Sequence, residues 1–214
     1  MLGDSITELG AEPGGYVRLL ERWLGELDPA HPAEVVNAGV SGQRSPDMLA
    51  RFAVDVVERR PDLVLISVGT NDVWHAFRDW STNMDHPAGD LPAGVSLDAF
   101  VACLDAMASQ AEAGGIEVVL VSPAVIHEDL DSPENIRLAS YVRAQHELAA
   151  ARGCRFVDLH TPFGLVIGAW RRHAGPAMNL LTTDGVHLNA AGNHLMAETI
   201  QRALEAGGRA DWPQ

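Results

Sequence analysis

Apolar and polar positions follow two rhythms along this chain, one typical of helices and one typical of buried strands. Between Tyr16 and Leu27, apolar side chains recur every three or four residues, as in a helix with one buried face. Residues 63–68 are almost continuously apolar, as expected for a parallel strand that is covered on both faces. The two patterns then alternate to the end of the chain.

The remaining elements follow from the same patterns. Residues 1–2 are expected to be the tail of a strand before a turn at residues 3–7. Further strands are predicted at residues 34–37, 63–68, 116–122 and 155–159. Helices are predicted at residues 16–27, 46–60, 97–114, 133–152 and 161–172, with a last helix capped by Asn189. Ser45 is expected to cap the helix at residues 46–60, Ser132 to start the helix at residues 133–152, and Gly153 to end it.

This alternation predicts an α/β fold in one domain, residues 1–214. The expected architecture is a three-layer α/β/α, flavodoxin-like fold with a mainly parallel, five-stranded sheet. Its first strand is short, because only Met1 and Leu2 precede the first turn. Residues 74–95 break the rhythm, so this stretch is interpreted either as a wall or lid of a site or as a plain surface insertion.

Composition narrows the possible functions. The formal charge is −14, and all fifteen basic residues are arginine, so no lysine is present for Schiff-base or Walker-type phosphate chemistry. The acidic balance disfavours nucleic acid as a partner.

No apolar run reaches the roughly 18 residues of a membrane span. No signal peptide is recognised, so a cytoplasmic location is expected. Cys103 and Cys154 are expected to be buried free thiols.

Candidate chemistry gathers where predicted strands end. Ser5, Gly39 and Asn71 each follow a strand, and the carboxyl ends of parallel strands meet at one edge of a sheet. Asp184 and His187 lie three residues apart before the last helix. A carboxylate at this distance can orient an imidazole as a general base, which a serine nucleophile requires. The alternative interpretation is a capping aspartate and a surface histidine.

Other catalytic motifs are incomplete. Residues 39–43 approach the nucleophile elbow Gly-x-Ser-x-Gly but end in glutamine. The pairs His127-Glu128 and His146-Glu147 lack the second histidine of a zinc-protease helix. No Gly-x-Gly-x-x-Gly occurs, and the remaining histidines show no ligand spacing. We therefore expect neither a metal ion nor another cofactor.

Four short blocks, taken together, resemble the GDSL, or SGNH, hydrolase family. They are Gly3-Asp4-Ser5, Gly39, Gly69-Thr70-Asn71-Asp72 and Asp184-x-x-His187, in the order of the family and spread over nearly the whole chain. Members usually carry a full apolar strand before the first block. Here only two residues precede it, so either the chain is shortened or another segment fills the gap.

The resemblance implies a role for each matching position. Ser5 would be the nucleophile, His187 the general base and Asp184 its orienting acid. The oxyanion hole would consist of the backbone N–H groups of Ser5 and Gly39 and the side-chain amide of Asn71. Such fixed donors stabilise the charge that develops on the carbonyl oxygen.

Two further carboxylates belong to these blocks. Asp4 and Asp72 are interpreted as turn-forming groups that bind backbone amides. This interpretation is favoured over a direct role in the chemistry.

The predicted function is a serine esterase acting on short-acyl esters, including acetylated carbohydrate. Trp74, Phe77 and Trp80 would stack on a sugar or line an acyl pocket, or else belong to the core or a lid. The alternatives are an acyltransferase, a lysophospholipase or thioesterase with the same triad, and a non-catalytic carbohydrate-binding module. The expected partner is a small-molecule ester, and homo-oligomer formation is left open.

Overall fold

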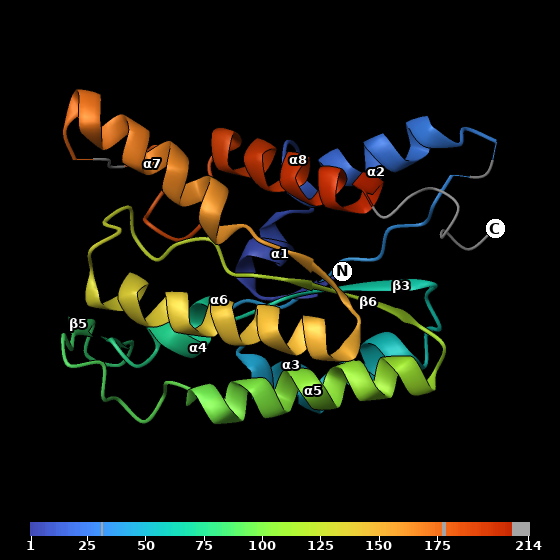
Figure 1. Ribbon diagram of the computed structural model, residues 1–214, viewed down its shortest axis with the longest axis horizontal. Coiled ribbons are helices and arrows are strands. Elements are labelled where there is room, and N and C mark those ends of the chain that lie inside the picture. Colours follow the sequence, from blue (N-terminus) through green and yellow to red (C-terminus); the bar gives the residue numbers. More distant parts are fainter. Residues whose placement is uncertain (31, 177–178, 207–214) are drawn as a thin grey trace.

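A parallel sheet forms the centre of the fold. The computed structural model describes residues 1–30, 32–176 and 179–206, and Figure 1 shows the sheet between two layers of helices. The strand order is β2-β1-β3-β6-β7, and every neighbouring pair is parallel. The strands are β1 Leu2–Gly3, β2 Ala38–Gly39, β3 Leu63–Ser67, β6 Glu117–Val121 and β7 Arg155–Val157. The predicted three-layer fold with five parallel strands is confirmed.

Strand β1 lies inside the sheet although it has only two residues. Leu2 pairs with Ala38 on one side and with Ile66 on the other, and Gly3 pairs with Gly39. The strand predicted at residues 34–37 is therefore wrong, since pairing with β1 begins only at Ala38. An extended segment becomes a strand only where a neighbour supplies hydrogen-bond partners.

A cavity of about 610 Å³ lies beside this short strand. It is bounded by Met1, by residues 33–36 and by Leu63–Leu65 of β3. Leu2 of β1 and Ala38 of β2 also border this cavity.

Each helical layer buries an apolar face against the sheet. In β3, Val64 and Ile66 point into one layer and Leu65 into the other, as the two-residue period of a strand requires. One layer holds α2 Tyr16–Leu27, α7 His160–Ala174 and α8 Ala190–Ala206. The other holds α3 Ser45–Phe52 with the π-helical turn η1 Ala53–Val57, α5 Leu97–Ala113 and α6 Pro133–Arg152.

Capping residues place most helix ends where the sequence predicts them. The Ser132 hydroxyl accepts the Asn135 N–H at the start of α6, and Gly153 ends this helix in the left-handed region with φ 69°. Asn189 Oδ1 accepts the N–H groups of Ala191 and Gly192 at the start of α8. These predicted caps are confirmed.

The predicted cap of α3 is wrong. Ser45 is the first residue of that helix, and its hydroxyl donates to Asp72. Asp47 accepts the Arg44 N–H at 3.0 Å and closes the helix start instead.

The hydrophobic pattern does not predict two short helices at the edge of the site. α1 Ser5–Leu9 and α4 Thr70–Trp74 begin directly after β1 and β3, where the sequence predicts turns. A helix of about one turn is too short to show a hydrophobic period. The segment after α4 contains an antiparallel pair, β4 Arg78–Asp79 and β5 Met84–Asp85, and is otherwise irregular.

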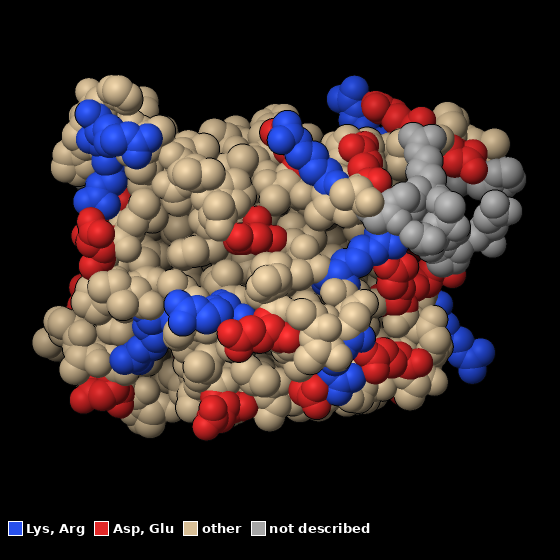
Figure 2. Space-filling view, in the orientation of Figure 1, with Lys and Arg blue, Asp and Glu red and all other residues tan. Residues whose placement is uncertain are grey.

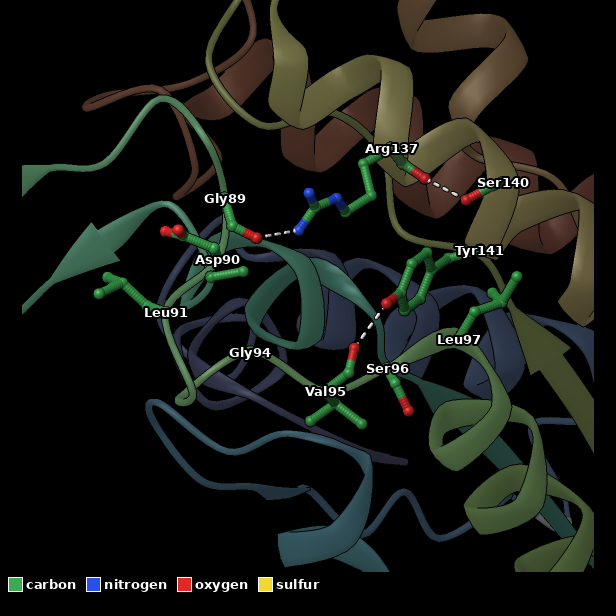
Figure 3. Close-up of a pocket in the computed structure, with 11 residues that line it drawn as sticks. Gly89, Asp90, Leu91, Gly94, Val95, Ser96, Leu97, Arg137, Ser140 and Tyr141 are labelled. Atoms are coloured by element: carbon green, nitrogen blue, oxygen red, sulfur yellow. Dashed lines mark hydrogen bonds between the residues drawn. The ribbon is translucent and has the colours of Figure 1, made fainter.

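Helix α6 holds part of this irregular segment in place (Figure 3). Arg137 donates to the carbonyl of Gly89 at 2.5 Å, and the Tyr141 hydroxyl donates to the carbonyl of Val95. A cavity of about 380 Å³ lies between the segment and α6. The polar side chains of Arg137 and Tyr141 thus anchor residues 89–95 to the helical layer.

The surface carries mixed charge. On the face shown in Figure 2, basic and acidic side chains lie next to one another rather than in separate areas. Arg152, for example, pairs with Asp105 and Glu112 at 2.6 and 2.9 Å. No helix in the described ranges combines the length and apolarity of a bilayer-spanning segment. Cys103 and Cys154 are free thiols, as predicted, but they are half-buried rather than fully buried.

Candidate active site

Ser5 lies at the turn between β1 and α1. Asp4 separates the strand from the helix, and its Oδ1 accepts the Ile6 N–H at 3.0 Å as an N-cap. Ser5 is therefore the first residue of a helix, and its own backbone N–H has no intrahelical acceptor. Only 9% of Ser5 is exposed. The local sequence thus places a largely buried hydroxyl at the carboxyl edge of the sheet.

His187 connects Ser5 to Asp184. The Ser5 hydroxyl lies 2.9 Å from His187 Nε2, and His187 Nδ1 lies 2.6 Å from Asp184 Oδ2. A carboxylate only accepts hydrogen bonds, so Nδ1 carries the proton and Nε2 accepts the hydroxyl of Ser5. Ser5 and His187 are 182 positions apart in the sequence, and the fold brings them together with Asp184.

Backbone groups fix the Asp184 carboxylate. Its Oδ1 accepts the N–H groups of Val186 at 3.0 Å and His187 at 2.8 Å. Partial burial acts to raise the pKa of Asp184, but the hydrogen bonds from the His187 ring and these N–H groups outweigh it and lower the pKa. Asp184 is therefore ionised at neutral pH and can stabilise a His187 cation.

Asn71 lies in the first turn of α4, at the end of the strand next to β1. Its Nδ2 donates to the carbonyl of Gln43 at 3.0 Å. An amide nitrogen carries two hydrogens, so this bond orients the group and leaves the second hydrogen for another acceptor.

Gly39 does not have the geometry of an oxyanion donor, and this assignment is corrected. Its N–H donates to Asn37 Oδ1 at 2.8 Å and is therefore already used. A Cβ at this position would lie 2.2 Å from the Glu8 nitrogen and 2.7 Å from the Thr7 carbonyl carbon. Gly39 is needed because α1 packs directly against its backbone.

Gly42, in the same loop, is a candidate oxyanion donor that the sequence motifs did not indicate. It adopts φ +76°, in the left-handed region, and a Cβ there would meet nothing within 4 Å. Its N–H makes no hydrogen bond with the described residues, and the next residue, Gln43, holds Asn71. The sequence offers two glycines in one loop, and only the hydrogen bonds distinguish them.

Asp4 and Asp72 bind backbone amides, as predicted, and both are buried. Asp72 accepts the Ser45 N–H at 3.0 Å, and also its hydroxyl. Burial raises the pKa of Asp4 to about 7, which the Ile6 N–H opposes and the nearby Asp72 charge supports. Burial likewise raises the pKa of Asp72 to about 6 against the hydrogen bonds from Ser45.

Two of the three predicted aromatic residues form a pair that contacts His127, a neighbour of the triad loop, residues 184–187. Trp74 and Trp80 meet edge to face with ring centroids 4.8 Å apart, and Trp80 is 53% exposed. Trp74 also meets the His127 ring at 5.8 Å, and the His127 N–H donates to the carbonyl of Gly185 at 2.6 Å. The tryptophan pair is thus connected to the loop between Asp184 and His187.

Phe77 is a core residue, so of the two interpretations that the sequence leaves open, the structure supports the core and not contact with substrate. It is 3% exposed and packs in the larger apolar cluster of the fold. The Arg137 guanidinium lies over its ring, 4.5 Å from the ring centroid.

A cavity of about 360 Å³ lies next to His187. Its walls come from α1 and the loop after it, and from the chain that follows His187. The residues that line it include Ile6, Leu9, Pro13, Thr183, Leu188 and Asn193. The imidazole therefore borders a space that can hold a small molecule.

The fold and the hydrogen-bonded chain from Ser5 to Asp184 define a class, the serine hydrolases with an α/β/α sheet. Residues 1–195 match the sequence model of the GDSL-like Lipase/Acylhydrolase family. The chain belongs to this family and is a carboxylic ester hydrolase. The predicted resemblance is confirmed.

Similar proteins cover almost the same length. An acetylxylan esterase from Geobacillus stearothermophilus is 29% identical over 218 residues, which span 95% of this chain and 91% of that protein. Esterase TesA from Pseudomonas aeruginosa is 27% identical over 96% of this chain and 86% of its own. The crystal structure of the acetyl xylan esterase AlAXEase matches with a TM-score of 0.80 at 29% identity, covering 95% and 97% of the two chains.

Axe2, an acetylxylan esterase from Geobacillus stearothermophilus, has been solved as catalytic mutants. In these, a serine, an aspartate or a histidine is replaced by alanine. The aspartate precedes the histidine by three positions in that protein, as Asp184 precedes His187 here.

Proposed function

We propose that this protein removes acetyl groups from carbohydrate through an acyl-enzyme on Ser5. The observation that carries the proposal is the chain Ser5–His187–Asp184, with contacts of 2.9 and 2.6 Å. His187 Nε2 takes the Ser5 proton as Oγ attacks the acyl carbon, and the Asp184 carboxylate stabilises the resulting cation. His187 then gives this proton to the leaving alcohol, which departs.

The second half of the reaction uses the same groups. His187 takes a proton from a water molecule, which attacks the acyl carbon of the ester on Ser5. The tetrahedral intermediate collapses, the proton returns to Ser5 Oγ, and the carboxylic acid is released. Each half-reaction therefore needs His187 neutral at its start.

Three donors would hold the oxyanion in both intermediates. We assign this role to the N–H groups of Ser5 and Gly42 and to the second amide hydrogen of Asn71. All three groups lie at the carboxyl edge of the sheet, and they make no other hydrogen bond with the described residues. Gly42 replaces Gly39 in this assignment because the Gly39 N–H is occupied.

Three features support acetylated carbohydrate as substrate. An acetylxylan esterase is 29% identical over 95% of this chain. The exposed ring of Trp80, supported by Trp74, offers a flat apolar surface of the kind on which sugar rings stack. The cavity beside His187 gives the leaving alcohol room next to the group that protonates it.

Hydrolysis of 4-nitrophenyl acetate tests the reaction. Wild type is expected to turn over the ester, and Ser5→Ala and His187→Ala should each lose at least about a thousandfold in kcat. Ser109→Ala, on α5 and away from the strand ends, is the matched control and should retain activity. Either triad variant within a few-fold of wild type would refute the assignment, and binding of sugar without turnover by wild type would favour a carbohydrate-binding module.

The substrate class has a separate test. Acetylated xylooligosaccharide and 4-nitrophenyl acetate are compared for wild type and Trp80→Ala. We expect the variant to show a raised KM for the oligosaccharide only, because the small ester does not reach Trp80. An equal change for both substrates, or faster turnover of octanoyl than of acetyl esters, would contradict the proposed class.

A further inference from the structure

Glu128 is a buried carboxylate that the proposed reaction does not use. It is 6% exposed and follows β6, while the groups that contact it come from the chain just before Asp184. Its Oε1 accepts the N–H groups of Leu181 at 2.7 Å and Thr182 at 2.9 Å, and also the Thr182 hydroxyl at 2.9 Å. Its Oε2 accepts the Leu180 N–H at 2.7 Å. One carboxylate thus binds three successive backbone amides.

The same contacts continue into the triad loop. The Thr182 hydroxyl, which donates to Glu128, also accepts the Gly185 N–H at 3.2 Å. The Gly185 carbonyl accepts the N–H of His127, the residue before Glu128, at 2.6 Å. The carbonyl of Gly185 is therefore held by His127, and its N–H is held by the Thr182 hydroxyl that Glu128 binds. Gly185 lies between Asp184 and His187.

The approach is close enough to require glycine. Gly185 has φ +97°, and a Cβ there would lie 2.4 Å from His127 Nδ1. His127 itself adopts φ +56°, which is uncommon for a residue with a side chain. Two left-handed residues in contact indicate that this junction is closely specified by its surroundings.

We propose that Glu128 is the positioning residue of the triad loop. Its carboxylate fixes residues 180–182, and through Thr182 and Gly185 it sets where His187 stands relative to Ser5. Carboxylates accept N–H groups through strong, charge-assisted bonds, and without them these amides would be buried without partners. This inference rests on the proposed function, because it concerns the same His187–Ser5 contact.

The expected effect lies in kcat. Positioning errors of about 1 Å can reduce turnover about a hundredfold. Glu128→Gln keeps the length of the side chain and one acceptor oxygen, but it presents an NH₂ group to one set of donors. We expect kcat for 4-nitrophenyl acetate to fall at least tenfold in Glu128→Gln and about a hundredfold in Glu128→Ala, with KM changed less than about threefold.

Two controls separate positioning from folding. Glu147→Ala removes an exposed carboxylate from α6 and should behave as wild type. Circular dichroism gives the folded fraction, to which kcat is normalised, and Glu128→Gln decides the question where Glu128→Ala does not fold. Added formate should raise kcat in Glu128→Ala but not in Glu147→Ala, because it can occupy the space that the carboxylate leaves.

The proton NMR signal of His187 Nδ1 in its hydrogen bond to Asp184 provides a readout that does not need turnover. We expect this low-field signal in wild type and in Glu147→Ala, and its loss or weakening in Glu128→Gln. Normalised kcat within twofold of wild type, or an unchanged low-field signal, would overturn the proposal. An inactive wild type would refute the esterase function, while the NMR signal would still decide whether Glu128 positions the loop.

Discussion

Replacement of Asp4 by Asn is expected to stabilise the protein at alkaline pH. Asp4 is 3% exposed, and burial raises its pKa from its ordinary value of 3.8 to about 7. The Ile6 N–H opposes this rise, and the Asp72 charge adds to it. The difference of about three pKa units corresponds to about 4 kcal/mol, at about 1.4 kcal/mol per unit. Above pH 7, ionisation of the buried Asp4 therefore lowers the free energy of unfolding by about 4 kcal/mol.

The sign follows from proton binding. Between about pH 4 and pH 7 the folded state holds a proton on Asp4 that the unfolded state has lost, so stability falls as pH rises through this range. Below pH 4 both states are protonated, and this contribution is fully retained. Asn keeps the acceptor for the Ile6 N–H but carries no charge, so Asp4→Asn does not lose stability in this way.

Thermal unfolding from pH 4 to pH 8 measures the effect. A gain of about 4 kcal/mol corresponds to about 10 °C in Tm for a domain of this size, and the gain should shrink toward zero at pH 4. Asp90→Asn, at an exposed position, is the control and should show no pH-dependent gain. Identical pH dependence of Tm in wild type and Asp4→Asn would refute the reasoning.

Further substitutions examine the oxyanion site and its support. Asn71→Ala should lower kcat about 100- to 1000-fold with little change in KM, because its amide acts only on the developing charge; a loss confined to KM in ester-hydrolysis kinetics would contradict this. Gly39→Ala places a Cβ 2.2 Å from the Glu8 nitrogen, so calorimetry should show a loss of about 1–3 kcal/mol. Gly164→Ala, where a Cβ meets nothing within 4 Å, should not lower Tm, and equal Tm values for the two variants would argue against the predicted clash.

Much of the fold is predictable because it depends on local pattern. The apolar run at residues 63–68 and the helical period at residues 16–27 each describe an element whose burial is periodic in the sequence itself. Caps such as Asn189 act over three residues and are equally local. The strand at residues 34–37 was wrong because strand formation depends on a partner, and β1 offers only two residues.

The residues of the candidate site also divide into those that the sequence predicts and those that it does not. Ser5, Asn71, Asp184 and His187 stand in recognisable blocks, and the order of strands and helices brings such blocks to one edge of the sheet. The sequence thus determined the fold class, the family and the residues of the hydrogen-bonded chain. It could not separate Gly39 from Gly42, because both are glycines in one loop and they differ in whether the N–H is already bonded.

Only the tertiary structure decided which remaining side chains serve the site. Phe77 is a core residue because it packs in the apolar cluster of the fold, and Arg137, sixty residues later, lies over its ring. Glu128 belongs to an incomplete metal motif in the sequence, yet in the fold it binds three amides more than fifty residues away. Burial and hydrogen-bond partners depend on segments that meet only after the chain folds, whereas a motif or a hydrophobic period is carried by neighbouring residues.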